Sequence, residues 1–279
     1  MAGRPRTAPA DRGEAGSPGG RPDPATEGFL AHRNLLFTVA YEMLGSAADA
    51  EDVLQETWLR WAGVDLGIVR DQRAYLVRIT TRQALGRLRT LGRRKESYVG
   101  PWLPEPLLTA PDVAEDVELA DSVSMAMLLV METLTPAERA VFVLHDVFDF
   151  GYDEIAESVG KTPAAVRQIA HRARSHVAAR RPRGPVSPAE TGKALEAFLR
   201  AAQTGDMQDL LAIGLDRIAA AASIQPVQVN GYPALILRLD GEVDTVIAVR
   251  IDDGLITGLY AVRNPAKLSH MAQETALRR

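Results

Sequence analysis

The spacing of apolar residues changes once along the chain, and this change constrains the fold more than any other feature. From Phe29 to residue 203 apolar positions recur at helical spacing, whereas four short apolar runs follow residue 223. The runs are Ile224–Val229, Ala234–Leu239, Val243–Ile251 and Leu255–Val262. The dipeptides between them, which favour hairpin turns, are Asn230-Gly231, Asp240-Gly241 and Asp253-Gly254. We therefore predict a mainly α-helical chain that ends in an α+β domain, with one helix (189–203) and four antiparallel strands.

Proline and glycine divide the helical part into domains. Helices are expected over 29–44, 46–61, 73–91, 112–132, 136–148, 152–159 and 162–180. The proline-rich stretches at 98–111 and 182–188 exclude a continuous helix there. We expect a disordered tail (1–26), a first helical domain (27–97), a linker (98–111), a second helical domain (112–183) and the C-terminal α+β domain (184–279). For the tail, a tag or a misassigned start codon is the alternative.

Composition excludes several classes of protein. The chain is 46% hydrophobic and 24% charged, which is typical of a globular protein. It has no cysteine, which excludes disulfides, thiolate metal sites and cysteine nucleophiles. Neither a long apolar run nor a secretory signal is visible, so a cytoplasmic protein is expected. The five histidines show no metal-ligand spacing, and we expect neither a metal nor a cofactor.

Basic residues are concentrated in two predicted helices. From Arg70 to Lys95 there are nine basic residues and one acidic residue, Asp71, and from Lys161 to Arg183 there are seven basic residues and none acidic. The net charge is −4, so the rest of the chain is acidic. Two separate cationic segments fit a polyanion that is bound at two places. The alternative, an ordinary solvated helix face, explains one such segment more easily than two.

The stretch Tyr152–Gln168 has the pattern of a helix-turn-helix. Ile155 occupies an inner position of the first helix, and Gly160 supplies the turn. Thr162 is a favourable N-cap, and Pro163 suits the first turn of the second helix. The residues expected toward a DNA groove are Thr162, Ala164, Arg167, Gln168, His171, Arg172 and Arg174. Arginine and glutamine can donate to guanine and adenine edges. The alternative is an ordinary helical hairpin.

Three segments taken together resemble a known family. Ala48–Arg60, Arg73–Ile79 and the helix-turn-helix occur in the order found in bacterial sigma factors of the extracytoplasmic-function type, within the sigma-70 family. The resemblance covers roughly residues 29–181. It implies two helical DNA-binding domains that bind RNA polymerase core and promoter DNA. It also implies promoter recognition and transcription initiation rather than enzymatic activity.

The resemblance suggests a role for each charged helix. The acidic helix 49–61 looks like the surface that docks on the polymerase β′ coiled coil, through Asp49, Glu51, Asp52, Gln55 and Glu56. The helix Arg73–Arg89 looks like the reader of the −10 element, where cations hold phosphates and polar groups hold opened bases. Its candidate contacts are Arg78, Thr81, Arg82, Gln83 and Arg87. The helix 162–177 looks like the reader of the −35 element. Trp58 and Trp61 are expected in the core rather than stacked on DNA.

Two further segments resemble a narrower group. Trp102–Pro106 and Asn264–Leu268 look like the signature pair of sigma factors that carry a SnoaL-like C-terminal extension. The resemblance implies that this extension modulates activity by contacting the core domains. The residues expected to dock are Trp102, Leu103, Pro104, Asn264, Pro265, Lys267 and Leu268. The Asp-Gly-Gly-Gly-Lys segment usual in the extension is absent, so we expect an incomplete SnoaL-like domain that lacks one strand and one helix.

Two other functions are open alternatives at the level of sequence. A small-molecule-binding or isomerase-like C-terminal domain would need a buried carboxylate and an oxyanion donor. The residue types available are Asp206, Tyr232, Asp240 and Tyr260, of which Asp240 is better explained as a turn residue and Tyr232 as a strand residue. A DNA-binding regulator that never joins polymerase would need neither the acidic helix nor the first basic helix.

Overall fold

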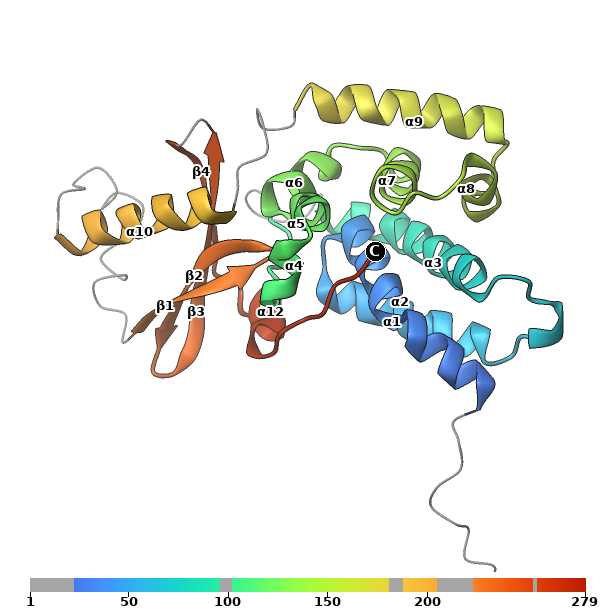
Figure 1. Ribbon diagram of the computed structural model, residues 1–279, viewed down its shortest axis with the longest axis horizontal. Helices are drawn as coiled ribbons and strands as arrows, with labels where there is room; N and C mark the ends of the chain where they lie inside the picture. The colour runs from blue at the N-terminus through green and yellow to red at the C-terminus, as the bar shows by residue number, and fades with distance from the viewer. Residues whose placement is uncertain (1–22, 96–101, 181–187, 205–222, 253–254) are drawn as a thin grey trace, which may run out of the picture.

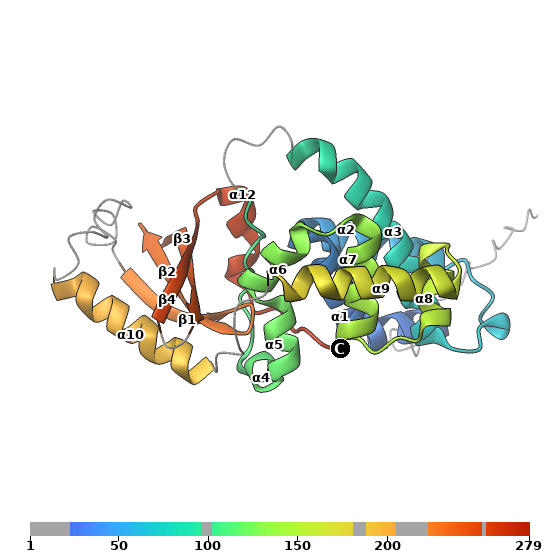
Figure 2. The ribbon, with the colours of Figure 1, turned by 90° about the horizontal axis from the view of Figure 1, so that it is seen from above.

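Helices fill one end of the molecule, and a four-stranded sheet fills the other (Figure 1). The structure is a computed structural model that describes residues 23–95, 102–180, 188–204, 223–252 and 255–279. Between the sheet and the helices at the opposite end of the molecule lie α4 (Pro111–Glu115), α5 (Val117–Val123), α6 (Met125–Glu132) and α12 (Pro265–Leu268), as the view from above shows (Figure 2). The names first helical domain, linker, second helical domain and C-terminal domain are kept for the described parts.

The first helical domain packs around Trp61. Its elements are α1 (Pro24–Leu44), α2 (Ala47–Trp61), the short 3-10 helix η1 (Leu66–Ile68) and α3 (Gln72–Lys95). Trp61 is fully buried, and its Nε1 donates to the Ala25 carbonyl oxygen at 2.7 Å. This confirms Trp61 as a core residue. It also explains why α1 begins at Pro24, earlier than predicted, because Ala25 is part of the same packing. The rest of the expected tail, residues 1–22, lies outside the described residues.

The second helical domain is more broken than the sequence predicts. Besides α4, α5 and α6 it contains α7 (Pro136–Phe142), a π-helical turn η2 (Val143–Val147), α8 (Tyr152–Val159) and α9 (Pro163–Ala178). The prediction of one helix over 112–132 is wrong. Asp116 and Ser124 interrupt it, because their side chains accept from the Leu119 and Met127 amides at 3.0 and 3.1 Å. Each thereby caps a new helix instead of continuing the previous one.

The C-terminal domain contains the four antiparallel strands that the sequence predicts. They are β1 (Ser223–Val229), β2 (Tyr232–Leu239), β3 (Glu242–Asp252) and β4 (Leu255–Val262), in the order β1-β2-β3-β4. Helix α10 (Pro188–Thr204) covers one face with Leu195 and Phe198, which pack on Leu235 and Ile247. The opposite face packs against α12 and the 3-10 helix η4 (Ser269–Ala272). Residues 205–222, where a strand and a helix were expected to be missing, lie outside the described residues.

One hydrophobic core runs through both helical domains. It includes Leu36 of α1 and Leu144 of η2, together with Leu107 from the linker and Leu277 from the end of the chain. Residues 104–107 of the linker are all buried. The sequence predicts a linker between two separate domains, whereas residues 104–107 of this linker are part of the packed interior.

A buried carboxyl group lies where the two helical domains meet. Glu42 of α1 is fully buried, and its Oε1 accepts from Ser122 Oγ at 2.8 Å. Arg139 of α7 donates from Nε to the Glu42 carbonyl oxygen at 3.0 Å and pairs with Glu132 at 2.7 Å. Burial raises the pKa of Glu42 to about 8, against the opposing effects of Ser122 and Arg139. Glu42 is therefore mostly a neutral acid near pH 7.

Replacing Glu42 should change the pH dependence of stability. Its pKa rises from 4.5 to about 8 on folding, so the folded state binds more protons between these values. Its contribution to the free energy of unfolding therefore falls as pH rises through this window. Glu42→Gln should lack that part of the slope, up to about 1.4 kcal/mol per pH unit. Urea unfolding of both proteins from pH 4.5 to pH 8 measures the difference, and equal slopes would contradict it.

Candidate nucleic-acid and polymerase interfaces

Helix α9 buries one face in the second helical domain and exposes the other. Gly160 ends α8 with φ at 67°, and Thr162 Oγ1 accepts from the Ala165 amide at 3.3 Å to begin α9. Val166 and Ala170 are fully buried on the inner face. The seven predicted groove-facing residues, Thr162, Ala164, Arg167, Gln168, His171, Arg172 and Arg174, are all exposed. The exposed face therefore has the donors that base edges and phosphates need.

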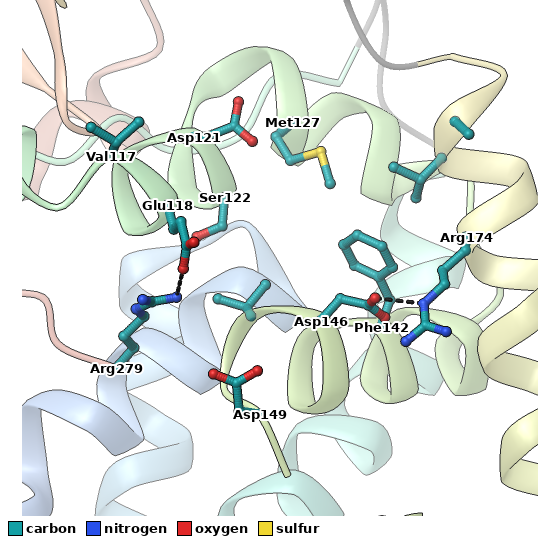
Figure 3. Close-up of a pocket in the computed structure, with 13 residues that line it drawn as sticks. Val117, Glu118, Asp121, Ser122, Met127, Phe142, Asp146, Asp149, Arg174 and Arg279 are labelled. Carbon is teal, nitrogen blue, oxygen red and sulfur yellow. Dashed lines mark hydrogen bonds and ion pairs between the residues drawn. The ribbon is translucent and has the colours of Figure 1, made fainter. Parts of the chain in front are cut away.

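Arg174 lies at the margin of this face and turns toward a cavity. The cavity has a volume of about 680 Å³ and lies among α5, α6, α7, η2 and α9 (Figure 3). Arg174 pairs with Asp146 at 2.6 Å, and this hydrogen bond raises the pKa of the guanidinium. On the opposite wall Arg279 pairs with Glu118. Arg174 is thus held by its own domain, apart from the other predicted DNA contacts.

In helix α3 the structure corrects the expectation for Thr81. Thr81 is fully buried, on the same side as Leu76, Val77, Thr80 and Ala84. A threonine at a core position of an amphipathic helix looks polar in the sequence but does not reach the surface. In this arrangement Thr81 cannot contact an opened DNA strand, whereas Arg78, Arg82, Gln83 and Arg87 are at least partly exposed.

Two of these arginines are held by the second helical domain. Arg78 Nη1 lies 2.8 Å from Glu157 Oε2, and Arg82 Nη2 donates to the Glu157 carbonyl oxygen at 2.7 Å. Glu157 is on α8, the first helix of the helix-turn-helix. Nearby, Arg73 lies over the Phe150 ring, 4.5 Å from its centroid. The basic face of α3 is therefore packed against α8, a contact that the local sequence pattern did not predict.

The predicted polymerase-binding acids divide into paired and exposed groups. Arg87 Nε donates to Asp49 Oδ1 and its Nη2 donates to Asp52 Oδ2, both at 2.7 Å. The hydrogen bond with Asp49 raises the pKa of Arg87. Arg33 binds both carboxylate oxygens of Glu51 at 2.8 Å. Asp49 itself is buried, so it and Glu51 are held mainly within the first helical domain.

The outer face of α2 is a smaller surface than the sequence suggested. Asp52, Gln55 and Glu56 are exposed, and Gln83 lies close enough to donate to Glu56 at 3.2 Å once its amide is turned. One turn after Gln55, Leu59 is 68% exposed. Sequence reasoning missed Leu59, although an apolar residue on the acidic side of an amphipathic helix was a visible signal. We call Asp52, Gln55, Glu56 and Leu59 the α2 surface.

The two predicted docking segments lie in contact. Lys267 Nζ donates to the Leu103 carbonyl oxygen at 2.6 Å and lies 3.6 Å from the centroid of the Trp102 ring. Pro104 is buried, Leu103 and Leu268 pack in one cluster, and Pro265 opens α12. Asn264 caps α12 by accepting from the Ala266 amide at 3.0 Å. The linker and the C-terminal domain are therefore in direct contact through these two segments.

Glu105 extends this docking to the first helical domain. Its carboxylate accepts from the Ala47 amide at 2.7 Å and from Ser46 Oγ at 2.9 Å. These groups lie at the N-terminus of α2, where the helix dipole favours a negative charge. The C-terminal domain thus binds the linker at Trp102 and Leu103, and the first helical domain binds it at Glu105.

Of the four residues considered for an isomerase-like site, the three that the structure describes lie on different elements. Tyr232 opens β2 and Tyr260 lies in β4, two strands that do not pair with each other. Asp240 is exposed at a turn with φ at 53°, and Asp206 lies outside the described residues. Among the residues that the structure describes, no group of side chains could hold a metal ion, and no helix is long and apolar enough to cross a membrane.

The arrangement defines a helix-turn-helix protein with a second basic helix and an added α+β domain, and the comparisons agree with this class. The family model "Sigma-70 region 2" matches residues 29–94, and "Sigma-70, region 4" matches residues 124–177. The "Probable ECF RNA polymerase sigma factor SigI" of Mycobacterium tuberculosis is 30% identical over 90% of this chain and 97% of its own length. The "ECF RNA polymerase sigma factor SigJ" of the same species is 44% identical over 54% of this chain and 49% of its own.

A solved structure extends the likeness to the C-terminal domain. The crystal structure of Mycobacterium tuberculosis SigJ matches with a TM-score of 0.67 at 29% identity, covering 88% of this chain and 98% of that one. The chain therefore belongs to the extracytoplasmic-function RNA polymerase sigma factors. It is a sigma factor, and such proteins bind RNA polymerase core and promoter DNA to start transcription.

The resemblance to sigma factors predicts that replacing Arg167 and Arg172, on the exposed face of α9, weakens −35 recognition. Arg167→Ala and Arg172→Ala each remove a guanidinium that can reach a base edge or a phosphate, at a cost of about 1–3 kcal/mol where the contact is bidentate. Binding of the polymerase-loaded variants to promoter duplexes with and without the −35 element measures this. Arg180→Ala, beyond the end of α9 and also exposed, is the matched control. Discrimination equal to that of the unmodified chain would refute the assignment.

Proposed function

We propose that α3 reads the −10 element, that α9 reads the −35 element and that the α2 surface docks on RNA polymerase. The observation that carries this proposal is that one chain combines two basic helices, α3 and α9, with the acidic and apolar α2 surface. Arg78 and Arg82 have the chemistry to hold an opened strand, and the exposed donors of α9 have the chemistry to hold a duplex. The docking surface adds Leu59, which supplies an apolar contact among the acids.

The compact arrangement cannot serve both DNA elements at once. Elements centred about 25 base pairs apart are separated by roughly 85 Å of duplex. A compact chain of this length has a radius of gyration of only about 19 Å. In addition, Arg78 and Arg82 are bound to Glu157 in place of phosphates. We therefore infer that the arrangement is a closed state, from which the two helical domains separate when polymerase and promoter bind.

In this proposal the C-terminal domain regulates the sigma factor. A helix on a four-stranded antiparallel sheet suits an incomplete SnoaL-like extension. Its contacts with the linker, through Lys267 and Trp102, support a role in stabilising the closed state. Loss of these contacts would change promoter binding without touching either DNA-reading helix.

Transcription with purified polymerase core tests the proposed function directly. The full chain should direct specific initiation on a promoter library, whereas Gln55→Lys combined with Glu56→Lys should lose co-purification with core and lose specific transcripts. Both residues are exposed, so the fold should be unaffected. Glu115→Lys, an exposed acid of α4, controls for charge. Specific transcripts from the double variant, or none from the unmodified chain, would overturn the proposal.

Charge reversal at Glu157 should release α3 from the second helical domain. Glu157→Arg places a third positive charge beside Arg78 and Arg82, and like charges in contact cost enough to favour the open state. Binding of the free chain to a single-stranded −10 oligonucleotide should become about tenfold tighter. Asp153→Arg, on the same helix and also exposed, is the control. Equal tightening by both variants would mean that added charge alone, and not release of α3, explains the effect.

A further inference from the structure

The turn between β1 and β2 is buried where three parts of the molecule meet. Asn230 is 1% exposed, and Gly231 is buried against α4 and α5. A Cβ atom on Gly231 would lie 2.7 Å from the Cβ of Ala120. The next hairpin turn, Asp240-Gly241, is exposed although its backbone is alike, with φ at 53° for Asp240 and 54° for Asn230. The burial of the first turn is therefore not a requirement of the hairpin.

The side-chain amide of Asn230 bonds to three different segments. Its Nδ2 donates to Tyr41 Oη of α1 at 2.7 Å and to the Val123 carbonyl oxygen of α5 at 2.8 Å. Its Oδ1 accepts from the Leu107 amide of the linker at 2.9 Å. The backbone amide of Asn230 also donates to the Leu107 carbonyl oxygen at 3.0 Å. One residue of the C-terminal domain thus joins the first helical domain, the linker and the second helical domain.

Tyr41 completes this group from the first helical domain. It is fully buried, and its Oη donates to the Glu105 carbonyl oxygen at 2.6 Å while accepting from Asn230. Burial raises the pKa of the Tyr41 phenol beyond its usual range, so the hydroxyl remains a donor. Both donors of Asn230 Nδ2 and the hydroxyl of Tyr41 are therefore satisfied only while all three parts stay together.

The linker beside this turn is held on both sides by isolated β-bridges. The Thr109 amide donates to the Gln228 carbonyl oxygen of β1 at 3.0 Å, and Leu108 pairs antiparallel with Val229. On the other side of the linker, the Thr275 amide donates to the Leu108 carbonyl oxygen at 2.7 Å. The C-terminal domain therefore holds the linker by backbone hydrogen bonds at the β1 edge of its sheet and from its last residues.

We propose that Asn230, together with Tyr41, is the latch that keeps the two helical domains closed on the linker. This inference deepens the proposed function, because it specifies how the C-terminal domain modulates the sigma factor. A hairpin turn of this type favours both asparagine and aspartate at the first position. The latch needs the amide donor, since a carboxylate would face the Val123 carbonyl oxygen and leave it unpaired in a buried place.

A distance measurement on the full chain, without polymerase, tests the latch. The chain has no cysteine, so Ala62→Cys and Ala179→Cys place one label on each helical domain at exposed helix ends. In this labelled chain, Asn230→Asp keeps the turn and removes the donor, and Tyr41→Phe removes the hydroxyl. Asp240→Asn at the exposed turn is the matched control. The population with separated labels should rise about tenfold or more with Asn230→Asp, rise less with Tyr41→Phe and stay unchanged in the control.

Two further readouts separate a latch from a merely structural residue. Amide hydrogen exchange of Leu235 and Ile247 should stay slow in Asn230→Asp, which shows an intact sheet, while exchange at Leu107 and Thr109 should accelerate. The effects of Asn230→Asp and Tyr41→Phe should be less than additive, because they break one shared bond.

Three results would overturn the latch. They are an unchanged label distance in Asn230→Asp, strictly additive effects of the two substitutions, and opening that occurs only with rapid exchange throughout the sheet. If Asn230→Asp changes the label distance but leaves transcription with polymerase core unchanged, the latch stands. The proposed regulatory role of the C-terminal domain then fails.

Discussion

A buried side-chain amide is costly unless each of its donors and acceptors has a partner, and Asn230 finds its partners only where three parts of the chain touch. The rest of the closed arrangement depends on this constraint. Asn230 holds Tyr41 and aligns the linker beside it. The β1–β2 turn lies in a site that has no room for a side chain at Gly231. Such a network favours one arrangement of the domains over many looser ones.

The closed arrangement has unequal consequences for the two basic helices that we propose to read DNA. The outer face of α9 is exposed, whereas the basic face of α3 is packed against α8 and its arginines are bound by Glu157. An exposed ion pair contributes little on its own, since solvent competes for both charges. The packed linker and the buried hydrogen bonds around Asn230 therefore contribute more to closure than the Arg78–Glu157 contact. That contact instead determines which surface is hidden.

Local patterns in the sequence predicted the elements well and their partners poorly. The helix-turn-helix and the four strands follow from hydrophobic period and turn residues, which act over a few positions. The same reasoning treated Asn230 only as a turn residue, because its other role depends on Tyr41, 189 positions earlier. Thr81 was expected at the surface because it is polar, but in this arrangement it lies on the buried side of α3. The helix breaks at Asp116 and Ser124 were missed because cap residues are also tolerated inside helices.

The distance between the two helical domains, measured in the unmodified chain before and after it binds polymerase core and promoter DNA, tests the central claim most directly. Labels at positions 62 and 179 report this distance from outside both basic helices, α3 and α9. The free sigma factor should show a single short distance between the labels. This distance should be longer by several tens of ångströms once both promoter elements are bound. Transcription from a complex in which the distance has not changed would contradict the account.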